Sequence, residues 1–111
     1  MKAVAVLGLI LFGFGCTKTP ADHNHQVAMQ DFVFAPESLE VAVDDTVTWV
    51  NQGASQHTST SGEVGAPDGK WDSGVLSSGG SFMQVFTTAG NYHYCCQIHG
   101  AMGMKAVISA K

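Results

Sequence analysis

The residues of this sequence best suited to metal chemistry lie close together near its C-terminal end. Within the stretch from Tyr94 to Met104, Cys96 and His99 are three positions apart, and His99 and Met104 are five apart. A loop of this length can place all three side chains around one point. Thiolate, imidazole and thioether are soft to intermediate donors, which favour copper over hard cations such as magnesium or calcium. The spacing therefore predicts a copper site in this loop.

One loop cannot complete the site alone, so a second imidazole is expected from elsewhere in the chain. The sequence has five histidines, which are His23, His25, His57, His93 and His99. The first two lie in a polar segment, and His93 is three positions from Cys96 on a predicted strand, so it should face the opposite side of the sheet. His57 remains as the candidate. Two histidines and a cysteine with a weak axial methionine form the blue-copper type of electron-transfer site.

The elements that must position these ligands are predicted to be strands. Thr46 to Val50 is rich in β-branched and aromatic residues, and Leu39, Val41 and Val43 recur with a period of two. Further strands are expected at 27–34, 81–87, 91–96 and 104–109, whereas 51–80 is dense in Gly, Ser, Thr and Asp without helical periodicity. Six to eight short strands and almost no helix predict one all-β domain over residues 27–111, an antiparallel β-sandwich.

Several motifs give the chain a family resemblance. The Cys-x-x-His-x-x-x-x-Met spacing, the segments FVFAPESLEV and DTVTWVN, and AGNYHYC leading into the cysteine resemble a small cupredoxin of the plastocyanin/pseudoazurin kind. The resemblance covers residues 27–109. It implies a Greek-key sandwich with one type 1 copper, in which His57 and His99 supply imidazole nitrogens, Cys96 the thiolate and Met104 the long axial thioether.

Three positions near the predicted ligands leave questions open. Met102 competes with Met104 as the axial ligand, and the family spacing favours Met104. Thr58 stands where the family often has Asn, which leaves the hydrogen bonding to the cysteine sulfur undefined. Ile98 stands where many members have Pro. Such differences around a metal ligand would tune its reduction potential.

Cys95 lies directly before the predicted thiolate ligand. Adjacent strand residues point to opposite faces, so Cys95 should not bind the same copper as Cys96. Neighbouring cysteines also rarely form a disulfide, because the bridge would strain the intervening peptide. The family resemblance allows a second electron-exit surface at this position, and a small buried residue is the simpler alternative.

The N-terminal segment predicts export from the cytoplasm. Lys2 precedes an apolar stretch, Ala3 to Phe14, that is too short to span a bilayer as a helix. Residues 1–15 are therefore predicted to be a signal peptide of the lipoprotein type, with Cys16 as the lipidated residue, and ordinary secretion as the alternative. Residues 16–26 are polar and would tether the domain to a bacterial membrane on the periplasmic side.

The charge of the predicted mature chain bears on its partners. Residues 16–111 have four lysines and nine acidic residues, a formal net charge of −5, which argues against nucleic-acid binding. A redox partner such as a c-type cytochrome or a copper or haem reductase is expected to dock near His99 and Met102. We expect the protein to be a monomer.

The main alternatives to an electron carrier differ in their donor sets. No acid–base pair and no additional histidine cluster of the kind a multicopper enzyme needs is evident in the sequence, so an enzyme is not expected. A periplasmic copper carrier or storage protein is the principal alternative, and it would hold Cu(I) without redox cycling. A structural zinc site would be favoured only if the axial methionine were absent.

Overall fold

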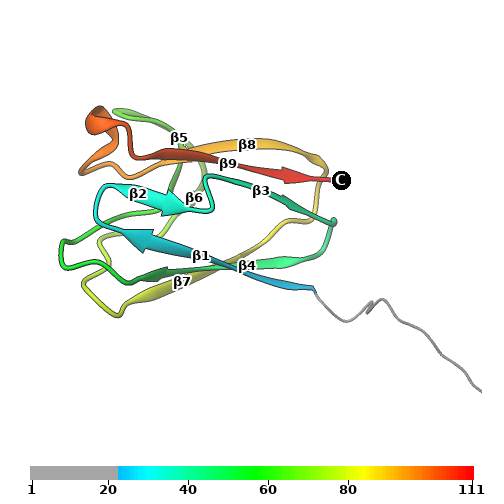
Figure 1. Cartoon of the computed structure of the whole chain (residues 1–111). Helices are drawn as coiled ribbons and strands as arrows, with labels where there is room; N and C mark the ends of the chain where they lie inside the picture. Colours follow the sequence, from blue (N-terminus) through cyan, green and yellow to red (C-terminus); the bar gives the residue numbers. More distant parts are fainter. Residues whose placement is uncertain (1–22) are drawn as a thin grey trace, which may run out of the picture.

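The computed structural model describes residues 23–111, and these form two β-sheets packed face to face. Figure 1 shows the strands running along the long axis of the sandwich, with loops gathered at its two ends. The nine strands are β1 (Asn24–Gln30), β2 (Val33–Ala35), β3 (Ser38–Val41), β4 (Thr46–Asn51), β5 (Thr60–Glu63), β6 (Ala66–Asp72), β7 (Ser81–Val85), β8 (Gly90–Cys95) and β9 (Lys105–Ala110). A short 3-10 helix, η3 (Gly100–Met102), precedes β9.

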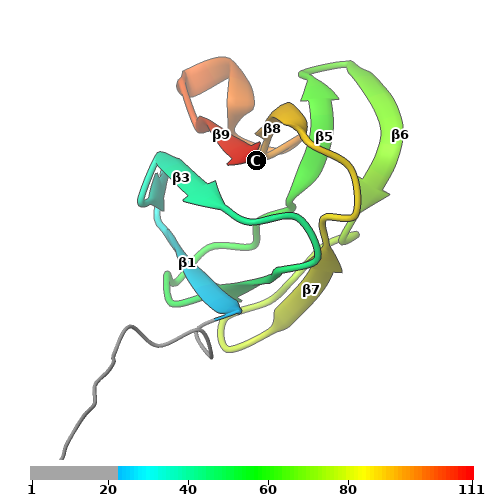
Figure 2. The ribbon, with the colours of Figure 1, turned by 90° about the vertical axis from the view of Figure 1, so that its right-hand side faces the viewer.

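The two sheets have the orders β2-β1-β4-β7 and β3-β9-β8-β5-β6. Figure 2 looks along the sandwich from one end and shows β1 and β7 in one layer, with β3, β9, β8, β5 and β6 in the other. The predicted all-β sandwich is confirmed, but its strands are not all antiparallel. β1 pairs with β4 in parallel, and β3 pairs with β9 in parallel, so both sheets are mixed.

Alternation along the strands builds the core between the sheets. In β4, Val47, Trp49 and Asn51 are buried, and the residues between them are half-buried. Trp49 lies at the centre of an aromatic cluster, with ring centroids 5.4 Å from Tyr94 and 5.6 Å from Trp71. Both tryptophans lie in the core, since each is at most 6 % exposed.

Two parts of the sandwich differ from the sequence prediction. The single strand expected over 27–34 is divided into β1 and β2 by a turn at Asp31 and Phe32, where Phe32 has a φ of 72°. The segment 51–80 contains β5 and β6, which the sequence did not indicate. β5 has no large apolar side chain, and β6 is an edge strand that buries only Trp71, so neither has the alternation of a half-buried strand.

The boundary between domain and tether also differs from the prediction. β1 begins at Asn24, so residues 24–26 belong to the sheet and not to the polar tether expected over 16–26. The predicted signal peptide, Cys16 and the first part of the tether lie outside the described residues. Within residues 23–111 no helix is long and apolar enough to cross a membrane.

Candidate metal centre

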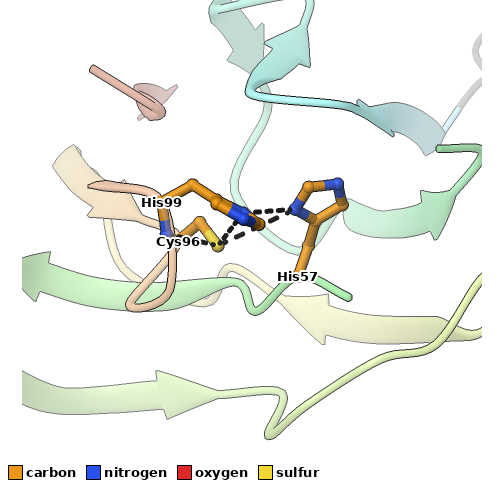
Figure 3. Close-up of side chains that lie close together, drawn as sticks. All are labelled: His57, Cys96 and His99. Carbon is orange, nitrogen blue, oxygen red and sulfur yellow. Dashed lines mark hydrogen bonds between the residues drawn. The ribbon is translucent and has the colours of Figure 1, made fainter. Parts of the chain in front are cut away.

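Three of the predicted ligands meet at one end of the sandwich. Cys96 follows the last residue of β8, and His99 immediately precedes η3, so one short loop presents both side chains. His57 lies between β4 and β5, where its backbone N–H and C=O both bond to Leu76 at 3.1 and 2.8 Å. Figure 3 shows the imidazoles of His57 and His99 and the thiol of Cys96 pointing toward one another.

The distances between the donor atoms fit a three-ligand metal site. The Nδ1 atoms of His57 and His99 are 3.1 Å apart, and Cys96 Sγ lies 3.9 Å from the first and 3.8 Å from the second. Metal–nitrogen and metal–sulfur bonds of about 2.0 and 2.3 Å in a planar trigonal arrangement would separate the donors by about 3.5 to 3.8 Å. A single ion therefore fits between them with little movement. The fold thus brings His57 to Cys96 and His99, which follow it by 39 and 42 positions in the sequence.

Two backbone N–H groups surround the sulfur of Cys96. Those of Thr58 and His99 both donate to Sγ at 3.4 Å. The Thr58 side chain serves another purpose, because its Oγ1 accepts a hydrogen bond from the Gln97 N–H at 2.9 Å. The replacement of Asn by Thr at this position thus leaves a donor to the sulfur in place, since that donor belongs to the backbone. Donors to a thiolate stabilise its negative charge and tune a bound metal.

The two candidate axial methionines differ in their surroundings. Met104 is fully buried, and its carbonyl oxygen accepts a hydrogen bond from the Cys96 N–H at 3.1 Å. Met102 lies in η3 and is 65 % exposed. Of the two candidates, Met104 is thus the one enclosed in the sandwich next to Cys96, and Met102 lies at the surface.

The two imidazoles of the cluster are exposed to very different degrees. His57 is fully buried, whereas His99 is half-buried. The ring of Phe32 meets the His99 ring edge to face at a centroid distance of 4.9 Å. Phe32, Ile98 and Met102 are all more than 40 % exposed, so apolar side chains lie at the surface on both sides of His99.

Two residues of this end were missed by the sequence analysis, and both lie in the β1–β2 turn. Asp31 places Oδ1 3.2 Å from Nε2 of His57, and its neighbour Phe32 packs on His99. The pKa of Asp31 is lowered, chiefly by the N–H of Ser55 that donates to its carboxylate. No spacing in the sequence connects this turn to residues 26 or more positions away, so only the pairing of strands could have found it.

Cys95 lies next to the site but faces away from it. It is 1 % exposed, and its Sγ accepts a hydrogen bond from Gln97 Nε2 at 3.4 Å. Burial raises the pKa of the Cys95 thiol, with the nearby Glu63 adding to the effect. Both Cys95 and Cys96 are free thiols. Cys95 therefore offers no exposed surface for a second electron exit.

The histidines of the predicted tether lie at the opposite end of the sandwich. Nδ1 of His23 and Nε2 of His25 each lie 2.8 Å from one carboxylate oxygen of Asp45. The Asp45 side chain is only 4 % exposed. Its pKa falls to about 2, mainly through the hydrogen bond from His25 and then through that from the Ala42 N–H. This arrangement is a hydrogen-bonded cluster around a buried carboxylate.

Comparisons with known proteins place this site in a family. Residues 21–111 match the family of copper binding proteins, plastocyanin/azurin family. The plastocyanin of Scenedesmus fuscus is 33 % identical over 85 residues, which cover 71 % of this chain and 87 % of that protein. The chloroplastic plastocyanin of Tetradesmus obliquus is 32 % identical over 111 residues, covering 93 % and 77 %. Among solved structures, a purple cupredoxin from Nitrosopumilus maritimus has a TM-score of 0.72 at 26 % identity and covers 78 % of this chain and 99 % of that one.

The sandwich fold and the thiol–imidazole cluster define the class as a cupredoxin, a single-domain copper protein. The chain belongs to the plastocyanin/azurin family of copper-binding proteins. It is thus a blue-copper protein of the electron-transfer type, as the sequence motifs predicted.

Proposed function

We propose that His57, Cys96, His99 and Met104 hold one type 1 copper and that the chain carries single electrons between redox partners. The observation that carries this proposal is the convergence of three donor atoms within 4.8 Å of one another. A copper ion bound there would supply the one-electron couple. The chain's own residues fix the donors in place before binding, which limits reorganisation on electron transfer.

The proposed electron port is the half-buried edge of His99. The two neighbouring side chains Phe32 and Met102 are exposed and apolar, and together with Ile98 they make a small docking face around that imidazole. A docking face of only three apolar side chains suits brief encounters, such as those of redox pairs, better than a permanent complex. We propose that a c-type cytochrome or a copper or haem reductase docks here, and that the carrier works as a monomer and has no enzymatic activity of its own.

The proposed cellular location rests on the sequence. An export signal over residues 1–15 and a lipidated Cys16 would place the domain in the periplasm, tethered to a bacterial membrane. β1 begins at the end of the sandwich opposite the loop between β8 and β9 (Figure 1), and that loop contains His99. A tether attached at the start of β1 would leave the docking face directed away from the membrane. Mass spectrometry of the membrane fraction would test this, since an acylated Cys16 adds the mass of the acyl chains.

The copper site is tested by adding Cu(II) to the purified protein and recording visible absorption and electron paramagnetic resonance. We expect an intense thiolate-to-copper band and a narrow parallel hyperfine splitting, followed by reversible bleaching on reduction. A colourless protein that binds only Cu(I) would contradict electron transfer and favour copper carriage or storage.

A further inference from the structure

The Asp31 carboxylate lies behind the buried ligand imidazole, at the nitrogen that faces away from the metal donors. Its Oδ1 is 3.2 Å from His57 Nε2, while His57 Nδ1 faces the other two donors. An ionised carboxylate can only accept hydrogen bonds, so the proton of the neutral imidazole must be on Nε2. The lone pair is then on Nδ1, which is the form that a metal needs.

Asp31 is itself held in place by the loop that carries His57. The backbone N–H of Ser55 donates to Oδ1 at 3.0 Å, and that of Ala54 donates to Oδ2 at 3.3 Å. Position 53 has no side chain, and a Cβ there would overlap the Asp31 carboxylate. The carboxylate therefore joins two segments that are more than twenty residues apart, and the glycine makes their close approach possible.

His99 has no comparable support. Within residues 23–111 no protein group forms a hydrogen bond with its Nε2, and its ring contacts Phe32 at the surface. The two imidazoles therefore differ: the outer nitrogen of His57 faces a carboxylate, and the outer nitrogen of His99 lies near the docking face. Carboxylates behind ligand histidines fix their tautomer and raise their basicity as ligands.

We propose that Asp31 is a positioning residue that presents His57 Nδ1 to the metal and favours the oxidised over the reduced ion. The proposal rests on the proposed copper site. Its physical basis is that a negative charge stabilises a divalent cation more than a monovalent one, and a more basic imidazole is the better donor to Cu(II). Since the Asp31 side chain is 36 % exposed, solvent screens part of the charge effect.

The test is the variant Asp31→Asn, because its amide oxygen can still accept hydrogen bonds from Ser55 and His57 while the charge is lost. The matched control is Asp44→Asn, the same change at an exposed residue of the turn before β4. That turn and Asp31 lie at opposite ends of β4, whose six residues span about 20 Å. Both variants are loaded with copper, and their reduction potentials are compared with that of the unchanged protein.

We expect Asp31→Asn to weaken Cu(II) binding relative to Cu(I) by about tenfold, which raises the one-electron potential by about 59 mV. The thiolate band should keep its intensity, since the donor geometry is retained, and Asp44→Asn should leave the potential unchanged. Equal potentials in the two variants would overturn the proposal. A lower melting temperature without a change in potential would show a merely structural role, and it would overturn the proposal as well.

A second measurement needs no variant and no metal. Long-range ¹H–¹⁵N spectra of the metal-free protein report which ring nitrogen of His57 carries the proton. We expect Nε2, and a proton mainly on Nδ1 would overturn the positioning role even if Asp31→Asn failed to fold. Absence of the thiolate band in the unchanged protein would instead count against the copper site, and so the two failures are distinguishable.

Discussion

Each end of the sandwich brings two histidines together with a third side chain, yet the two clusters differ in chemistry. At one end, His57 and His99 turn nitrogen atoms toward each other and toward the Cys96 thiol, and all three donors face a common point. At the other end, His23 and His25 each face one oxygen of Asp45, so every polar atom of that carboxylate is used.

The comparison teaches that the third residue decides what two histidines do. A thiol adds a donor and leaves the lone pairs of the imidazoles available for a soft metal. A buried carboxylate instead accepts hydrogen bonds from the imidazoles and makes a charge-assisted cluster that stabilises the fold. The cluster at one end therefore offers donors to a metal. The cluster at the other end links the start of β1 to the turn before β4 through hydrogen bonds.

The largest expected effect distinguishes two adjacent thiols at the metal end. Cys96→Ser should abolish the intense visible band completely, because a serine hydroxyl does not replace a thiolate ligand. Cys95→Ser is the matched control, since Cys95 faces away and bonds to Gln97. The absorption spectrum of the Cu(II)-loaded variants is the measurement, and loss of the band in Cys95→Ser alone would refute the ligand assignment.

The two methionines of the same loop give the next test. Met104→Ala removes a fully buried side chain, and we expect it to lower the free energy of unfolding by about 2–5 kcal/mol. It should also change the copper spectrum, as expected of an axial ligand. Met102→Ala should alter neither, because Met102 is 65 % exposed, but it should slow electron transfer to a docked partner. Urea unfolding, electron paramagnetic resonance and stopped-flow kinetics measure the three effects, and an altered spectrum in Met102→Ala would reverse the axial assignment.

At the opposite end, Asp45→Ala should affect the fold and spare the metal. Its removal leaves Ala42, His23 and His25 without their shared acceptor, and we expect the melting temperature to fall by roughly 5–15 °C. The copper spectrum should be unchanged. Calorimetry and absorption on the same samples check both expectations. A changed spectrum with an unchanged melting temperature would show that Asp45 acts on the metal end and not on the stability of the fold.

The smallest expected effect is a pH dependence of stability at that end. The folded pKa of Asp45, about 2, is below the ordinary value of 3.8, so its contribution to stability is present above about pH 4. That contribution is lost as the pH falls toward 2, because the carboxyl must then be protonated. Denaturant midpoints of the metal-free protein between pH 6 and pH 2 measure the loss, and Asp45→Asn should flatten the curve. An equally steep curve in that variant would assign the effect to other carboxyls.

The candidate ligands of the C-terminal loop could be proposed from the sequence because their spacing is local. Cys96, His99 and Met104 lie within nine residues, and no other part of the chain is needed to bring them together. The core strands were predictable for a similar reason, since alternation in β4 repeats over only six residues. His57 could be found only by elimination among five histidines and by the family resemblance.

The direction of pairing between β1 and β4 could not be predicted, and it determines both ends of the molecule. The sequence favoured antiparallel strands, but the pair is parallel, with Asn24 opposite Thr46 and Met29 opposite Asn51. Two parallel strands begin at the same end of the sheet and finish at the same end. The start of β1 therefore lies beside Asp45, and the turn after its end lies beside the loop that leads to His57.

The sequence by itself predicted the all-β sandwich, the family and the candidate donors of the C-terminal loop, because these depend on residue type, alternation and short spacing. Only the tertiary structure decided which groups stand behind those donors. Asp31 reaches His57, and Phe32 reaches His99, through a turn that no local pattern relates to either histidine. The physical reason is that these contacts depend on strand direction and register, which are settled when the two sheets pack.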